Sequence, residues 1–120
     1  MMPIPLRFLC ENVMVLVCTE TDQYQNPVYG KSYSVRRCRT ELRADVAKKT
    51  ENTTLSHAGT LFVDAWHTSP DLDWLNLLKT SQAAGGDLIV VTEDNTRYPV
   101  LQAKPYSADG RLHHWEISLG

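Results

Sequence analysis

Two adjacent histidines near the end of the chain are the first candidates for chemistry. His113 and His114 lie in the stretch GRLHHWEISLG, whose alternation is typical of a β-strand. Neighbouring strand residues point to opposite faces, so the pair is not expected to clamp one metal ion. No HxH, HExxH or Cys/His spacing joins them to His57 or His67. We expect a structural pair, with His113 beside the core and His114 facing solvent or a subunit.

Cysteine is the second candidate. Cys38 lies among arginines that would favour a thiolate, but no base is evident beside it, and a packed side chain is favoured. Together with Cys10 and Cys18 it makes an odd number of cysteines without CxxC spacing, which predicts a reduced protein made in the cytosol. GxSxG, Walker and GxGxxG motifs are absent. We therefore expect no catalytic residues, no metal and no cofactor.

The third candidate is a basic segment. Residues 31–49 hold seven basic side chains against two carboxylates, a local charge of +5, whereas the rest of the chain sums to −7 and the whole to −2. Clustered arginines beside a polar loop suit phosphates or an acidic subunit surface, and a solvated strand face is the alternative. The candidates for a subunit or DNA contact are Arg36, Arg37, Arg39 and Arg43.

The elements that must position these side chains are short. A chain of 120 residues, 42% of them hydrophobic, can bury one modest core, which predicts a single domain over residues 1–120. Apolar runs separated by turn residues predict an all-β fold, a small barrel of about six antiparallel strands with one long loop and one short helix. The strands are expected at residues 11–19, 32–43, 58–67, 87–93, 97–106 and 111–119.

Two of these runs allow finer expectations. The run 11–19 is apolar on both alternations, which predicts a strand covered on both faces. Residues 20–30 are predicted to form a hairpin loop in which Tyr24 and Tyr29 are partial anchors. No apolar run approaches the roughly 20 residues of a membrane helix.

One helix is predicted over residues 70–84. Ser69 is suited to cap it, Pro70 fits the first helical position, and Gly85 can end it. Packing on the parent barrel is favoured for its apolar face, with a subunit interface as the alternative; the interface candidates are Leu72, Trp74, Leu75 and Leu78. Residues 44–57 form a long polar stretch, and loops of such length are usually functional or disordered.

Several segments together carry a resemblance. These are PIPLRFL at the start, NVMVLV, NPVYG before YSVRRCR, then TLFVDAW and YSADGRLHHWEISL. They resemble the minor capsid proteins of tailed bacteriophages, a family of small head-to-tail connectors similar to the stopper, or head-closure, proteins. The resemblance covers nearly the whole chain, and its motifs are structural. One segment departs from it, because PDLDWLNLLKTSQAAGG is longer and more helical than the corresponding family linker.

The resemblance implies a structural, non-enzymatic protein of the virion neck that is assembled in the host bacterial cytoplasm, without a membrane. It implies a ring of copies of this chain, a dodecamer, with a hexamer as the alternative. The ring would lie between a portal-adaptor ring and a tail terminator or completion protein, and would close the channel on packaged double-stranded DNA. The loop 44–57 would point into this channel, and the expected channel-facing residues are Lys48, Lys49, Thr50, Glu51, Asn52 and Thr53.

Three other functions stay open at this point. A neighbouring neck or tail-completion ring protein would have a similar architecture. A small DNA-binding module would use the basic segment. A small metal-dependent or cysteine enzyme has the least support in the sequence.

Overall fold

The structure is a computed structural model that describes residues 4–42 and 58–120. The described part is mostly β-strand, with one α-helix and one 3-10 turn. The elements follow in the order η1 (Leu6–Phe8), β1 (Glu11–Val17), β2 (Glu20–Thr21), β3 (Pro27–Val28), β4 (Lys31–Leu42), β5 (Gly59–Asp64), α1 (Trp74–Ala83), β6 (Ile89–Val91), β7 (Arg97–Ala108) and β8 (Arg111–Leu119).

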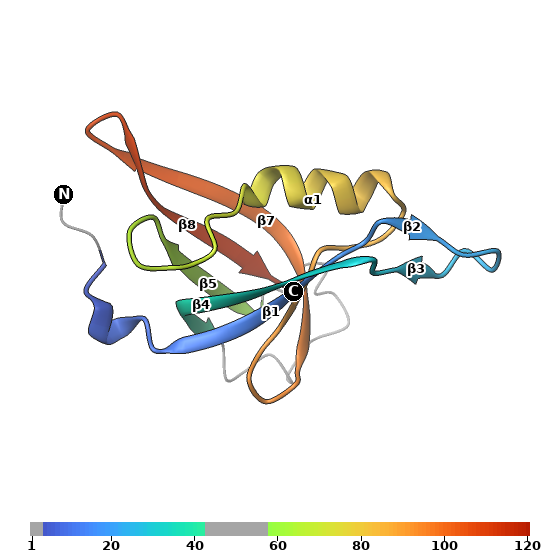
Figure 1. Ribbon diagram of the computed structural model, residues 1–120, viewed down its shortest axis with the longest axis horizontal. Helices are drawn as coiled ribbons and strands as arrows, with labels where there is room; N and C mark the ends of the chain where they lie inside the picture. The colour runs from blue at the N-terminus through green and yellow to red at the C-terminus, as the bar shows by residue number, and fades with distance from the viewer. Residues whose placement is uncertain (1–3, 43–57) are drawn as a thin grey trace, which may run out of the picture.

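Six strands close into an antiparallel barrel. Their order around the barrel is β1-β4-β5-β8-β7-β6, and β6 pairs with β1 to close it. The short strands β2 and β3 form a separate two-stranded ribbon that projects from one end of the molecule (Figure 1). The all-β barrel with one helix that the sequence predicts is confirmed. Closure leaves no open edge in the barrel, so a small domain satisfies its backbone without a long row of unpaired groups.

Burial along the strands follows the alternation of residues in the sequence. In β8 every second residue is buried, from His113 to Leu119, and in β1 the buried residues are Val13, Val15 and Val17. The outer face of β1 is open, because Met14 is 39% exposed, so the expectation of a strand covered on both faces is wrong. The reason is that the helix lies along only part of the barrel wall, against β7 and β1 (Figure 1).

The last three strands form the predicted meander. Asn95 in the turn between β6 and β7 has φ 66°, and Asp109 and Gly110 between β7 and β8 have φ 53° and 76°. These are left-handed conformations, which Asn, Asp and Gly tolerate best, so the turn residues were predicted correctly. The turn of Asp94 is further fixed by hydrogen bonds from Thr92 and Thr96, and these bonds lower the pKa of the Asp94 carboxyl.

The helix begins later than the sequence predicts. It runs from Trp74 rather than residue 70, and Asp73 caps it by accepting a hydrogen bond from the Asn76 amide at 3.2 Å. The expected cap, Ser69, cannot serve because its backbone N–H and carbonyl both bond to Arg36 in an isolated bridge. Pro70 therefore precedes the helix instead of opening it.

One face of α1 packs on its own barrel. Trp74 and Ser81 are fully buried and Leu78 is 6% exposed, and the Ser81 hydroxyl accepts a hydrogen bond from the Cys18 amide at 3.2 Å. Leu75 points outward and is 38% exposed. Burial of this face supports the favoured alternative, packing on the parent barrel. In the described residues no helix is long and apolar enough to cross a membrane.

The β2–β3 ribbon corresponds to the predicted hairpin loop. Its turn is built on Asp22, whose side chain accepts hydrogen bonds from the amides of Tyr24 and Asn26 at 2.8 and 2.9 Å. Tyr24 is 75% exposed, so its expected role as an anchor is wrong. Tyr29 is partly buried, and desolvation, with smaller contributions from Cys18 and Asp87, raises the pKa of its hydroxyl.

Candidate functional site

A β-bulge interrupts the basic strand β4 at Arg37. Glu11 of β1 pairs with Cys38 and the next residue, Asn12, pairs with Arg36, so Arg37 has no partner in the register. Arg37 has φ 59°, a left-handed conformation that costs a non-glycine residue about 1–2 kcal/mol. Such bulges redirect side chains and are frequent beside functional sites.

The bulge changes which side chains face outward. Val35 and Cys38 are both fully buried, although they are three residues apart, and Arg36 and Arg37 between them are both exposed. Strict alternation would place Arg37 on the same face as the buried Val35. The extra residue shifts the pleat and brings both arginines to the outer surface.

Three contacts hold the bulge in place. The Thr68 hydroxyl donates to the Arg37 carbonyl at 2.5 Å and accepts from the Asp64 amide at 2.9 Å. The Arg37 amide donates to the Asn12 side chain at 3.4 Å. The loop after β5 and the start of β1 therefore fix the backbone of Arg37 from two sides.

Asp64 is the buried centre of the same region. Its carboxylate is 1% exposed and accepts hydrogen bonds from the amides of Trp66 and His67, at 3.0 and 2.9 Å, and from the Ile4 amide at 3.2 Å. Buried carboxylates need such donors to offset the loss of water. Asp64 thereby joins the first described residue of the chain to the loop that supports Arg37.

The N-terminal segment adds an aromatic residue to the basic surface. Phe8 of η1 is 41% exposed, and the guanidinium carbons of Arg7 and Arg39 lie 4.9 and 5.7 Å from the centre of its ring. These distances are within the range of cation–π contacts. Arg7 and Phe8 could not be predicted from sequence patterns, because their position against β4 depends on a contact between distant parts of the chain.

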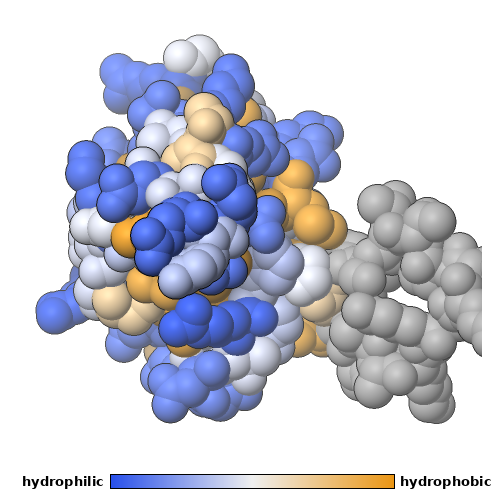
Figure 2. Space-filling model, turned by 90° about the vertical axis from the view of Figure 1, so that its right-hand side faces the viewer, coloured by the Kyte–Doolittle hydropathy of each residue, from blue (hydrophilic) through white to orange (hydrophobic). Residues whose placement is uncertain are grey.

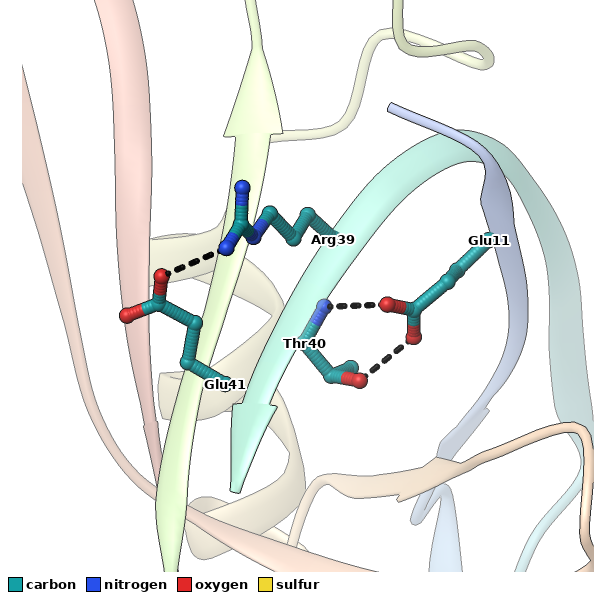
Figure 3. Close-up of polar contacts among 4 residues, drawn as sticks. All are labelled: Glu11, Arg39, Thr40 and Glu41. Atoms are coloured by element: carbon teal, nitrogen blue, oxygen red, sulfur yellow. Dashed lines mark hydrogen bonds and ion pairs between the residues drawn. The ribbon is translucent and has the colours of Figure 1, made fainter. Parts of the chain in front are cut away.

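Two carboxylates border this surface. Arg39 forms an ion pair with Glu41 at 3.1 Å, and both side chains are well exposed, 41% and 56% (Figure 3). Glu11 reaches across from β1 and accepts hydrogen bonds from the amide and hydroxyl of Thr40, at 3.3 and 2.5 Å (Figure 3). An exposed ion pair contributes little to stability, so Arg39 can exchange its partner at small cost.

Arg7, Arg36 and Arg37 have a different environment. Within residues 4–42 and 58–120, no carboxylate lies at ion-pair distance from any of these three guanidinium groups. We use the term arginine surface for Arg7, Phe8, Arg36, Arg37 and Arg39. Arg43, which the sequence analysis grouped with them, lies outside the described residues, as do all six expected channel-facing residues.

Cys38 is a packed side chain, as expected. It is fully buried, and its thiol donates to the Glu11 carbonyl at 3.3 Å. Desolvation, followed by the charges of Glu11 and Glu93, raises its pKa from 9.0 to about 12. The thiolate that the neighbouring arginines would favour is therefore suppressed, and Cys38 is unsuited to nucleophilic chemistry at neutral pH.

The two histidines contact each other directly. Their Nδ1 atoms are 2.7 Å apart, so one ring donates a hydrogen bond to the other. Zinc bound by both nitrogens at about 2.0–2.1 Å would hold them farther apart, and the described residues contain no group of three metal-ligating side chains. His113 is 5% exposed, as predicted.

His114 lies on the outer face of β8, opposite to His113, as expected of a residue that faces solvent or a subunit, but solvent reaches only a small part of it. Its side chain is 15% exposed and bonds through Nε2 to Glu116 at 2.9 Å. Tyr106 lies directly opposite on β7 and stacks on the His114 ring, with centroids 4.9 Å apart. The cross-strand partner therefore covers the face that was assigned to solvent.

A surface hollow lies beside the start of α1. It has a volume of about 510 Å³ and is lined by Asp71, Leu72, Asp73, Pro105, Leu112 and Trp115. It is an open groove and holds no cysteine, histidine, serine or lysine. At the ribbon end of the molecule, the described atoms in Figure 2 form a largely hydrophilic surface on which apolar residues are scattered.

Comparison with known proteins identifies the family of the chain. The model of one protein family, described as minor capsid protein, matches residues 5–119. No curated protein and no solved structure matches the chain. Since the match spans the barrel, the ribbon and the helix from end to end, the chain belongs to the minor capsid protein family, which is of phage origin.

Proposed function

We propose that this minor capsid protein is a stopper of the virion neck, a ring below the portal and adaptor that closes the DNA channel and receives the tail. Family membership assigns the chain a structural role as a virion component. The neck position, the ring and its neighbours go beyond that assignment. The ring is proposed to be a dodecamer of this chain, which contacts the portal-adaptor ring on one side and a tail terminator or completion protein on the other.

One observation carries this proposal. Strands β4 and β5 are antiparallel neighbours whose last pair is Leu42 with Gly59, so the chain ends that flank residues 43–58 meet at one end of the barrel. A closed barrel in which a long polar stretch of sequence connects two neighbouring strands at one end suits a ring in which each subunit contributes that stretch to a central channel. Side chains repeated by the symmetry of a ring become a girdle around its axis.

The segment is polar and carries charge that DNA would meet. We propose that Lys48, Lys49, Thr50, Glu51, Asn52 and Thr53 face the channel. Two lysines in each subunit, multiplied around the ring, attract the phosphates of packaged double-stranded DNA without reading its sequence. A change in the order of the segment on tail attachment would open the channel.

Disruption of the gene in its phage, followed by electron microscopy of the lysate, tests the neck role. The expected result is separate tails beside heads that packaged DNA and lost it. Full heads that keep their DNA but have no tail would favour a tail-completion ring instead. Normal virions would contradict both neck assignments.

Complementation then tests the segment. A variant in which residues 46–54 are replaced by a short Gly-Ser linker should fold and enter particles but release DNA early. The matched control replaces the exposed ribbon turn Gln23–Gln25 with Gly-Ser residues, which should leave DNA retention intact. Full retention of DNA by the 46–54 variant would contradict the channel role.

A further inference from the structure

Three guanidinium groups of the arginine surface, those of Arg7, Arg36 and Arg37, have no carboxylate at ion-pair distance within residues 4–42 and 58–120. The geometry of the surface suits an anion with many charges. We propose that it binds the phosphate backbone of double-stranded DNA, without sequence preference. The inference goes beyond the proposed neck role, since the contact lies on the outer wall of the barrel and not in residues 44–57. It stands on the geometry of the arginine surface and of the residues that contact it.

The β-bulge at Arg37 supports DNA binding, because it exposes two adjacent arginines. A regular strand would bury one of the two adjacent arginines, whereas the left-handed Arg37 lets both reach solvent. Arg39 follows two residues after Arg37 and shares its outward face by the alternation of the strand. The contacts of Thr68 and Asn12 hold this costly backbone, and strained backbone that is held in this way is typical of functional sites.

The guanidinium groups around the Phe8 ring also support binding of phosphate. Guanidinium groups of Arg7 and Arg39 both lie near its ring, which limits their motion before any ligand arrives. A guanidinium held against an aromatic ring still presents N–H groups at its edge, and these match phosphate oxygens in a bidentate manner. Because arginines flank the Phe8 ring, stacking of an unpaired base on it is disfavoured, and the backbone of a duplex is the better ligand.

The net positive charge of the arginine surface is the third observation that favours DNA. The surface carries four guanidinium groups, and the bordering carboxylates are Glu41, which pairs with Arg39, and Glu11, which is occupied by Thr40. A positive excess therefore remains on one wall of a chain whose total charge is −2. Duplex DNA presents about one negative charge per 1.7 Å of helix axis, which several arginines can contact together. Protein interfaces usually have an apolar centre, and within residues 4–9 the large exposed apolar residues are Leu6 and Phe8.

Binding of the full chain to a fluorescent 20-base-pair duplex, measured by anisotropy over a series of salt concentrations, tests this inference. The test variant combines Arg36→Gln with Arg37→Asn, because asparagine tolerates the left-handed conformation and preserves the bulge. The matched control combines Arg97→Gln with Lys104→Gln, two exposed cations on β7, which is separated from β4 by two strands in either direction around the barrel. Both variants lose the same charge, and unchanged thermal melting shows that each is folded.

The expected result is salt-dependent duplex binding that the test variant weakens about tenfold or more at low salt, with a slope of log K against log salt shallower by about two units. The control variant should bind like the original protein. Absence of duplex binding at low salt, or equal binding by the two variants, would overturn the inference. Normal DNA binding by the test variant together with its exclusion from particles would assign the surface to an acidic protein instead. The neck role is judged by the gene disruption, so either proposal can fail without the other.

Discussion

The hydroxyl of Thr68 joins two strands of the barrel, because it donates to the carbonyl of Arg37 at 2.5 Å while accepting from the amide of Asp64. On that side of β4, Ser69 bonds to the backbone of Arg36, and the Thr68 hydroxyl satisfies the carbonyl of Arg37 where regular pairing is interrupted. Thr68, a loop residue, therefore helps to hold the bulge that directs the side chains of Arg36 and Arg37 outward.

Replacement of Thr68 by valine should destabilise the protein. The change keeps the shape of the side chain but leaves a buried amide and a bulge carbonyl without their partner, each worth about 1–3 kcal/mol. Chemical denaturation should show a loss of about 2–4 kcal/mol in the free energy of unfolding. The control Thr80→Val, at an exposed position of α1, should change it by less than about 0.5 kcal/mol. Equal effects of the two substitutions would contradict the role of Thr68.

Asp64→Asn should weaken attachment of the N-terminal segment. The amide side chain has one acceptor oxygen where the carboxylate offered two, so donors among the Ile4, Trp66 and His67 amides lose their partner. We expect a loss of about 2–3 kcal/mol in unfolding free energy and faster hydrogen exchange at residues 4–9. The exposed Asp87→Asn is the control. Unchanged exchange at residues 4–9 would rule out the anchor.

The helix should respond to truncation according to the face that is changed. Leu78→Ala removes a side chain that is 6% exposed, and such substitutions cost about 2–5 kcal/mol. Leu75→Ala changes a side chain that is 38% exposed and should cost less than about 1 kcal/mol. Thermal or chemical denaturation of the isolated chain measures both. A larger loss for Leu75→Ala would show that the helix packs with its other face.

Cys38 should make stability fall in alkaline solution. Its pKa is about 12 in the folded chain and 9.0 in an ordinary thiol, so between these values the unfolded chain releases a proton that the folded chain retains. The stabilising contribution is complete below pH 9 and is lost as pH rises toward 12, by at most about 1.4 kcal/mol per pH unit. Unfolding free energies measured from pH 8 to 10.5 should decline less steeply for Cys38→Val.

The exposed Cys10→Val is the control for this pH series, and its slope should equal that of the original protein. A Cys38→Val slope identical to the original would contradict the buried thiol. Thiol-labelling reagents provide a second readout, since the folded chain should react at Cys10 and be protected at Cys18 and Cys38.

The features that sequence patterns predicted correctly are those that depend on local periodicity. Alternation in β8 indicated a buried His113, and the residues Asn95 and Gly110 indicated the turns of the meander. These features are determined by residues close together in the sequence, so they can be predicted without knowledge of the fold.

Features that depend on distant contacts were missed. The bulge at Arg37 arises from pairing with β1 and from Thr68, thirty-one residues away, and no local signal marks it. Ser69 has the chemistry of a helix cap, but its bridge to Arg36 removes it from the helix. His114 was assigned to solvent because the stacking residue Tyr106 belongs to another strand. The arginine surface likewise forms only when Phe8 packs against β4.

A symmetry-relaxed cryo-electron microscopy reconstruction of the virion neck tests the central claim most directly. The account predicts a ring of six-stranded barrels below the portal and adaptor, each with one segment between β4 and β5 directed toward the axis. Density for this barrel on the icosahedral shell, at the tail tip, or nowhere in the neck would contradict it.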